Sequence, residues 1–240
     1  MSKDYNAQVA THYSRYRPPL HEMILLKTIG KDKRFEIGLD IGCGTGKSSK
    51  PLSKFCNKVF GIDPSQSMID NAETYPSIDY ICSSSLAQFQ EDNFDVVTFA
   101  GSLSYAKNES LRRELNRICR DEAFVVIYDF EVLLNDLLLG TGLNLSTVDS
   151  SSYNHSINIS DWKEFKEKIV YKEQLDLNPS AGELAHLILS HSTWHDELAA
   201  LFRDQDPFAP LVSYLKSKGE EFRLPVNLFY SGYRFSKMRK

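Results

Sequence analysis

The first half of the chain alternates short apolar segments with segments of helical spacing. The apolar segments have the length and the β-branched and aromatic content of buried strands, and they cover residues 36–41, 58–63, 78–82, 94–100 and 123–130. Residues 63–65 place a capping residue and an early proline before the next helical segment. Residues 108–120 place Leu111, Leu115 and Ile118 on one face of a helix. Strands that alternate with helices predict a parallel sheet covered on both faces, which is a doubly wound α/β fold.

The second half of the chain follows a different pattern. Residues 131–162 are rich in Ser, Asn and Leu and show no clean period. Two further segments resemble strands, 169–177 and 226–235, and three between them resemble helices, 181–189, 197–202 and 210–217. We therefore predict a Rossmann-like, mostly parallel sheet of seven strands, with helices on both faces and a helical insertion or cap. The prediction is a single domain over residues 1–240, with an irregular insertion at 131–192.

Composition and charge exclude several classes of protein. Hydrophobic residues make up 42% and charged residues 25% of the chain, as in a typical globular protein. The formal charge of −4 argues against a surface that binds nucleic acid phosphates. No apolar run has the length of a membrane span, and the four cysteines show no CxxC spacing. We expect a cytoplasmic protein with reduced cysteines, no metal site, and neither nucleic acid nor membrane as a partner.

A glycine-rich loop at residues 39–49, LDIGCGTGKSS, could hold a nucleotide in more than one way. A phosphate-binding loop needs four residues between its first glycine and the Gly-Lys-Ser/Thr end. Only three residues separate Gly42 from Gly46, and Ile41 stands where the first glycine would be. The loop is therefore one residue short for a nucleotide hydrolase, which is the least favoured of the alternatives.

A carboxylate before the loop argues against a second alternative, the dinucleotide loop. The glycines follow a GxGxG rather than a GxGxxG pattern, and Asp40 precedes them. A carboxylate there would repel a pyrophosphate but suits a cationic amine or sulfonium. Asp63 ends the predicted second strand, 17 residues after Gly46, where a carboxylate can accept both ribose hydroxyls of an adenosine. These features together indicate a ligand with a ribose and a positive charge, and S-adenosylmethionine fits.

Three segments resemble class I S-adenosylmethionine-dependent methyltransferases: LDIGCGTG, FGIDPSQSMIDNA and FDVVTFAGSLSYA. The segment at 5–20 resembles the amino terminus of the trans-aconitate methyltransferase-like branch. By this resemblance, the glycine loop approaches the methionine part of the cofactor, Asp40 lies near its amino group, and Asp63 binds the ribose. The loop residues implied in cofactor binding are Gly42, Cys43, Gly44, Thr45 and Gly46.

The resemblance also implies contacts at the ends of the third and fourth strands. The family usually has an acidic residue followed by alanine after the third strand, facing the adenine. This chain has Ser83-Ser84-Ser85-Leu86 there, and Ser84 is the residue expected at the adenine. The fourth strand of the family ends facing the methyl group. This places Ser102 at the cofactor and Tyr105 near the acceptor.

The amino-terminal segment 12–20 has two interpretations. It fits an amphipathic helix that ends at Pro18-Pro19 and packs on the domain. It also fits a lid, within residues 1–20, whose Tyr13 and Arg17 cover the cofactor, with the Arg17 guanidinium offered to a carboxylate. His155, His191 and His195 lie in the second half of the chain, and we expect surface or packing roles for them.

The function expected from these features is methyl transfer from S-adenosylmethionine to a small-molecule acceptor. In-line displacement depends mainly on alignment, and a base is needed only if the acceptor must lose a proton. The sequence identifies no catalytic base, which suits O-methylation of a carboxylate. We expect residues 1–20 and the insertion to form the acceptor pocket. The alternative is a non-catalytic S-adenosylmethionine-binding regulator or subunit of a complex.

Overall fold

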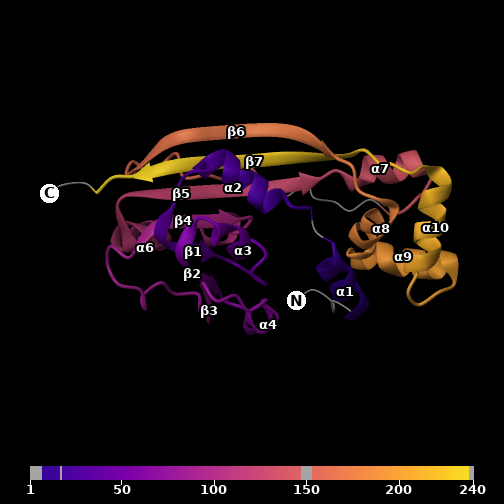
Figure 1. Ribbon diagram of the computed structural model, residues 1–240, viewed down its shortest axis with the longest axis horizontal. Coiled ribbons are helices and arrows are strands. Elements are labelled where there is room, and N and C mark those ends of the chain that lie inside the picture. Colours follow the sequence, from indigo (N-terminus) through magenta and orange to yellow (C-terminus); the bar gives the residue numbers. More distant parts are fainter. Residues whose placement is uncertain (1–6, 17, 147–152, 238–240) are drawn as a thin grey trace. The chain divides into compact units, whose positions relative to one another are not determined.

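The computed structural model describes residues 7–16, 18–146 and 153–237, and the chain forms two compact units (Figure 1). We call the first the sheet unit; it comprises Pro19–Phe130, Asn154–Glu173 and Leu228–Lys240. We call the second the helical unit; it comprises Met1–Pro18, Glu131–Tyr153 and Gln174–Asn227. The chain therefore passes between the units several times, while the single domain expected over residues 1–240 stays a prediction.

A seven-stranded sheet is the framework of the sheet unit. Its strands are β1 (Phe35–Ile41), β2 (Cys56–Asp63), β3 (Ile78–Cys82), β4 (Phe94–Ala100), β5 (Cys119–Val132), β6 (Phe165–Leu177) and β7 (Leu224–Phe235). The order is β3-β2-β1-β4-β5-β7-β6, and the strands from β3 to β5 pair in parallel. In Figure 1 the arrow of β7 runs opposite to that of β5. The sheet is mixed and mostly parallel, and the predicted Rossmann-like α/β fold is confirmed.

The helices of the sheet unit lie on both faces of this sheet. They are α2 (Leu20–Ile29), α3 (Ser49–Leu52), α4 (Gln66–Asp70), α5 (Leu103–Ala106) and α6 (Glu109–Ile118). Alternate residues of a strand point to opposite faces. The apolar face of α6 joins a core cluster with Leu39 and Val97. Leu52 of α3 lies near Gly38 on the opposite face, and α2 contacts α3.

Local signals in the sequence determine where two of these helices begin. Asn108 precedes α6, and its side chain accepts a hydrogen bond from the Leu111 backbone N–H at 2.9 Å. Ser65 caps α4 in the same way, through the Met68 N–H. Such caps satisfy backbone donors that the first turn of a helix leaves unpaired. The sequence pattern did not predict α2, whose core-facing residues make it an apolar helix without a clear polar face.

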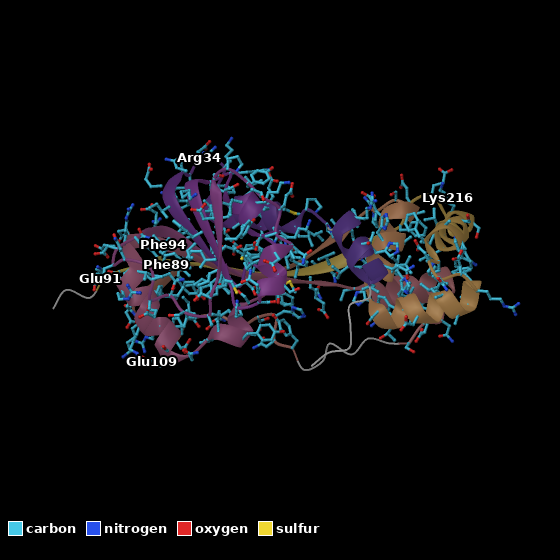
Figure 2. The ribbon with its side chains drawn as sticks, turned by 90° about the horizontal axis from the view of Figure 1, so that it is seen from below. Arg34, Phe89, Glu91, Phe94, Glu109 and Lys216 are labelled. Carbon is cyan, nitrogen blue, oxygen red and sulfur yellow. The ribbon has the colours of Figure 1, made fainter. Side chains whose placement is uncertain are left out.

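Aromatic side chains fill the part of the core between α6 and the sheet. Phe89 and Phe94 lie side by side with ring centroids 4.9 Å apart and nearly perpendicular planes (Figure 2). Phe60 packs edge-on against both rings. Edge-to-face pairs of this kind are favoured by the charge distribution of aromatic rings. They anchor the segment after β3 to the sheet, and this segment carries part of the candidate site.

The helical unit has its own apolar core. Its helices are α1 (Ala7–Arg15), α7 (Leu134–Thr141), α8 (Ala181–Leu189), α9 (Ser192–Phe202) and α10 (Phe208–Lys218). Leu138, Leu184 and Trp194 are among the buried residues of this core. Helix α7 lies within the segment for which the sequence showed no period. Across the described parts of the chain, no helix is both long and apolar enough to span a membrane.

A buried ion pair ties α6 to the segment that precedes β6. The Arg112 guanidinium donates to both carboxylate oxygens of Glu164, with Nη2 at 2.7 Å from Oε1 and 2.9 Å from Oε2. The Glu164 side chain is only 8% exposed. The hydrogen bonds from Arg112 lower the pKa of Glu164 below its usual range. Glu164 thus remains ionised in a largely buried position, because the guanidinium replaces its lost hydration.

We expect Arg112→Ala to lower the free energy of unfolding, because Glu164 loses its partner. The neighbouring Arg113 is exposed, and Arg113→Ala should change it by less than about 0.5 kcal/mol. The pKa of Glu164 is lower in the folded than in the unfolded protein. The stability that the ion pair contributes is therefore fully present above the pKa of Glu164 in the unfolded chain. It is lost as the pH falls through the pKa of Glu164 in the folded protein. Urea unfolding at about pH 7 and about pH 3 measures both effects. Equal losses for the two variants at neutral pH would contradict this assignment.

Candidate active site

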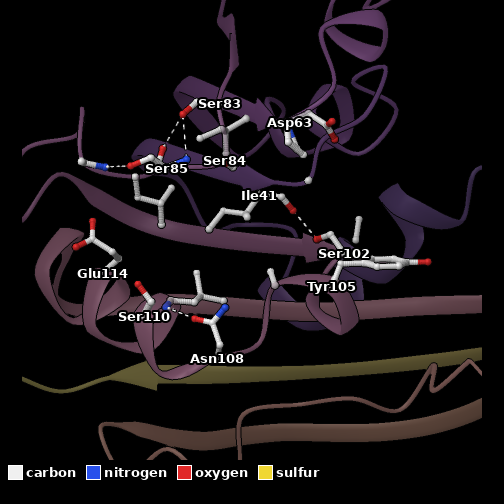
Figure 3. A pocket seen from close by; sticks show the side chains of 18 of the residues that line it. Ile41, Asp63, Ser83, Ser84, Ser85, Ser102, Tyr105, Asn108, Ser110 and Glu114 are labelled. Carbon is white, nitrogen blue, oxygen red and sulfur yellow. Dashed lines mark hydrogen bonds between the residues drawn. The ribbon is translucent and has the colours of Figure 1, made fainter. Parts of the chain in front are cut away.

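A cavity of about 770 Å³ opens at the carboxyl ends of the central strands of the sheet unit. Figure 3 shows Ser83, Ser84 and Ser85 on one side of it, and Asn108 and Glu114 on the other. This volume is within the range of about 300–1,000 Å³ that is usual for small-molecule sites. Its location matches the crevice at strand ends where open α/β sheets bind ligands. The lining residues are Ile41, Gly42, Ile62, Asp63, Pro64, Ser83, Ser84, Ser85, Leu86, Ala87, Ala100, Gly101, Ser102, Tyr105, Ala106, Asn108, Ser110, Leu111 and Glu114.

The glycine loop follows β1 with a backbone that other residues would adopt only at a cost. Gly42, Gly44 and Gly46 have φ values of +73°, +54° and +80°. A Cβ on Gly42 would lie 2.4 Å from the Cβ of Ser102, and one on Gly46 would lie 2.0 Å from the Tyr80 hydroxyl. The Ser102 hydroxyl also donates a hydrogen bond to the Ile41 carbonyl. The close approach of the loop to Ser102 therefore requires glycine at position 42.

Asp40 lies beneath the loop and is fully buried. Its Oδ2 accepts hydrogen bonds from the Ser48 and Ser49 hydroxyls at 2.6 and 2.7 Å. Its Oδ1 accepts from the Thr98 hydroxyl at 2.9 Å. Burial raises the pKa of Asp40, and these hydroxyl hydrogen bonds act in the opposite direction. The carboxylate therefore connects β1 to the start of α3 and to β4.

Asp63 stands at the end of β2, on the wall of the cavity. Its Oδ2 accepts the Gly44 backbone N–H at 2.9 Å, and its Oδ1 accepts the Ser65 N–H at 2.9 Å. A carboxylate offers about four lone-pair sites, so both oxygens can accept further hydrogen bonds from a ligand. Asp63 thus orients the glycine loop and presents an acceptor to the cavity.

The charges around the cavity favour a cationic ligand over a phosphate. Asp63 and Glu114 are acidic, and the described residues that line the cavity include no lysine or arginine. Lys47 is exposed and does not line the cavity. Ser48 and Ser49, which a phosphate-binding loop would turn toward a nucleotide and its magnesium ion, donate to Asp40. The phosphate-loop alternative therefore has no support in this geometry.

The structure brings together five of the residues that the sequence nominated. Gly42, Asp63, Ser84, Ser102 and Tyr105 all line the cavity, and Tyr105 is 83% exposed. The other nominated loop residues, which do not line it, are Asp40, Cys43, Gly44, Thr45 and Gly46. Among these, the Cys43 thiol is buried, and its burial raises its pKa well above the ordinary value.

The structure does not test the two residues that the sequence nominated for a lid. Arg17 and the side chain of Tyr13 lie outside the described residues, although Tyr13 belongs to α1.

The sequence did not nominate the wall of the cavity formed by α6. Asn108, Leu111 and Glu114 lie three residues apart, so they share one side of the helix and line the cavity together. Glu114 also forms an ion pair with Arg117 at 2.6 Å, and the hydrogen bond from Arg117 lowers its pKa. The spacing of these three residues was visible in the sequence. That they line a cavity could not be predicted, because only the fold places this helix beside the end of β3.

Comparisons with known proteins agree with this geometry. Residues 39–127, all in the sheet unit, match the family model described as a methyltransferase domain. A candidate methyltransferase of Dictyostelium discoideum is 22% identical over 74% of this chain and 66% of its own length. The ubiquinone biosynthesis O-methyltransferase of Bradyrhizobium diazoefficiens is 41% identical, over 25% of each chain. The chain therefore spans less than two thirds of the length of these relatives.

A solved structure shows the same fold over nearly the whole chain. A candidate type II methyltransferase from Anaeromyxobacter dehalogenans superposes with a TM-score of 0.64 and 17% identity, covering 93% of this chain and 98% of its own. Residues 39–127 thus match a methyltransferase domain, and this match supports S-adenosylmethionine as the expected cofactor. The trans-aconitate methyltransferase-like branch stays a prediction.

Comparing Gly42→Ala with Gly44→Ala should separate the stability cost of backbone strain from that of a steric clash. Both glycines have positive φ, which costs an alanine roughly 1–2 kcal/mol. Only at position 42 does the new Cβ meet another residue, Ser102. We expect Gly42→Ala to destabilise the protein more than Gly44→Ala, and Ser102→Gly to restore part of the loss in the double variant. Thermal unfolding of the four proteins measures this, and equal losses at positions 42 and 44 would disprove the close contact.

Proposed function

We propose that the chain is an S-adenosylmethionine-dependent methyltransferase that acts on a small-molecule acceptor. The observation that carries the proposal is the cavity, which lies within a methyltransferase domain and is acidic on its lining. A sulfonium and an α-amino group are both cationic. Carboxylates on the lining, and the absence of lysine and arginine among its described residues, therefore favour this cofactor over a nucleotide.

The roles proposed for the lining residues follow their positions. Asp63 would accept the ribose hydroxyls, because its oxygens reach the cavity while they hold the backbone of the glycine loop. The main chain at Gly42 would lie against the methionine part, and Ser84 would face the adenine. Ser102 and Tyr105 would border the transfer site.

We assign Asp40 a role different from a direct contact with the amino group of the cofactor. Its carboxylate is fully buried and already accepts three hydroxyl hydrogen bonds. It would act through the loop, by fixing Ser48 and Ser49 at the start of α3 and so the path of the glycines. The remaining loop residues, Cys43 to Gly46, would contribute backbone shape.

The chemistry required of the protein is mainly alignment. When bound, the cofactor supplies an electrophilic methyl group on a cationic sulfur. The protein must hold an acceptor atom in line with the methyl carbon and the sulfur. Proximity and orientation of this kind can supply roughly 7–11 kcal/mol of the barrier. Two features would hold this part of the cavity in place for that alignment. They are the close packing of Gly42 on Ser102 and the hydrogen bonds around Asp40.

The acceptor is proposed to be a small molecule because the acidic chain does not suit a polyanion. O-methylation of a carboxylate, as in the trans-aconitate methyltransferase-like branch, would need a cation to orient the acceptor. The lining residues that the structure describes offer none, and Arg17, the candidate from the sequence, is not among the described residues. The non-catalytic alternative, a cofactor-binding regulator, would show binding without transfer.

Methyl transfer from labelled S-adenosylmethionine tests the proposal. The protein is incubated with a small-molecule extract, with nucleic acid, and with protein, and we expect label only in the small-molecule fraction. Asp63→Ala should remove the transfer, because the ribose loses its acceptor. Asp70→Ala removes the same charge from an exposed position of α4 and should leave transfer unchanged. Label found in nucleic acid alone would overturn the choice of acceptor, and binding without any transfer would favour the regulator.

A further inference from the structure

Glu114 is a carboxylate on the lining of the large cavity, beyond the residues that would hold the ribose and the methionine part. It belongs to the α6 wall, and its side chain is 32% exposed, so a ligand in the cavity can reach it. Arg117 donates to it, with Nη2 at 2.6 Å from Oε2 and Nε at 3.3 Å from Oε1. A carboxylate offers about four lone-pair sites, more than these two hydrogen bonds use.

A chain of contacts connects Glu114 to the segment that follows β3. The Ser83 N–H donates to the Asp63 carbonyl at 2.9 Å, so this segment begins beside Asp63. Farther along it, the Leu86 carbonyl accepts a hydrogen bond from Arg117 Nη2 at 3.0 Å. The same guanidinium binds Glu114. Glu114 therefore lies across from the segment after β3.

The proposed position of the ribose determines which part of the cofactor would face Glu114. In the order β3-β2-β1, Asp63 of β2 stands between the glycine loop after β1 and the segment after β3. With the methionine part at Gly42 and the ribose at Asp63, the base would extend toward the segment after β3. Figure 3 shows Glu114 toward one end of the cavity and Ser102 toward the other. Glu114 is thus at the end where the base would lie.

This end of the cavity combines apolar surface with one group that can only accept. Leu86 and Leu111 line the cavity and belong to the buried core, so they offer apolar surface to the faces of a purine ring. The serine hydroxyls after β3 can donate or accept, so they do not distinguish an amino group from a carbonyl. Glu114 does, because the hydrogen bond from Arg117 lowers its pKa and the ionised carboxylate only accepts.

We infer that Glu114 selects adenine, by accepting a hydrogen bond from the exocyclic amino group of the base. This inference rests on the proposed function and adds a specificity-determining residue to it. A base with a carbonyl in place of the amino group, such as hypoxanthine, would present lone pairs to the carboxylate. Such a base is disfavoured, because two acceptors face each other.

Two ligands that differ only at this group test the inference in the full-length protein. S-adenosylhomocysteine carries the amino group, and S-inosylhomocysteine carries a carbonyl in its place. Calorimetry measures the affinity for each, and no turnover is needed. We expect the wild type to bind S-adenosylhomocysteine about 10–100-fold more tightly, which is the contribution expected of a hydrogen bond to a charged group.

Glu114→Gln should remove this preference. Glutamine keeps the size of the side chain and an oxygen that Arg117 can bind, but its amide nitrogen can also donate to a carbonyl. We expect the variant to bind the two ligands with affinities within about threefold of each other, because its amide can pair with either group.

Glu109→Gln is the matched control. Glu109 is an exposed residue of the same helix and does not line the cavity, so the variant loses the same charge outside the site. It should keep the wild-type preference for S-adenosylhomocysteine.

The ratio of the two affinities separates base selection from a merely structural role. A preference that is lost in Glu114→Gln and kept in Glu109→Gln supports the inference. Equal affinities in the wild type, or a Glu114→Gln variant that weakens both ligands by the same factor or keeps the full preference, overturn it and leave the proposed methyltransferase intact. Failure of the wild type to bind S-adenosylhomocysteine would remove the proposed function, and the inference with it.

Discussion

The site depends on one buried polar group, the Asp40 carboxyl group. A carboxyl group removed from water needs hydrogen-bond partners in its place. Ser48, Ser49 and Thr98 supply them, at 2.6 to 2.9 Å. These donors come from the start of α3 and from the neighbouring strand β4, so satisfying Asp40 fixes the two elements that flank the glycine loop. The loop therefore turns at a defined place, and its residues can approach Ser102 closely.

The chemical character of the cavity follows from this arrangement. Because the hydroxyls that follow the loop point to Asp40, they are not available to a phosphate or its metal ion. Asp63 binds the loop from the other side and still reaches the cavity. The other lining residues that the structure describes are acidic or weakly polar, and none of them is lysine or arginine. A ligand with a ribose and a positive charge fits such a lining better than a nucleotide phosphate does.

Features of the fold and site that depend on residues close together in the sequence could be predicted. Features that depend on contacts between residues far apart in the sequence could not. The strands are continuous apolar runs, and the glycines and Asp63 have a recognisable spacing, so the fold followed from the sequence, and five of the nominated residues lie together on the lining of the cavity. The wall formed by Glu114 and the pairing of His155 with Asp129 depend on how separate elements meet. The sequence nominated Asp40 for a place near the amino group of the cofactor, and it cannot show that three hydroxyls surround this carboxyl group. Helix α7 did not stand out in the sequence because it is only eight residues long.

The central claim is that this cavity binds the cofactor of methyl transfer, and calorimetry measures it most directly. The protein is titrated with S-adenosylhomocysteine and, separately, with ATP and magnesium, for the wild type and for Asp63→Asn. The account predicts one S-adenosylhomocysteine per chain, no ATP binding, and a weaker S-adenosylhomocysteine affinity in the variant, since one charged acceptor at the ribose is lost. Binding of ATP with magnesium, without binding of S-adenosylhomocysteine, would contradict it.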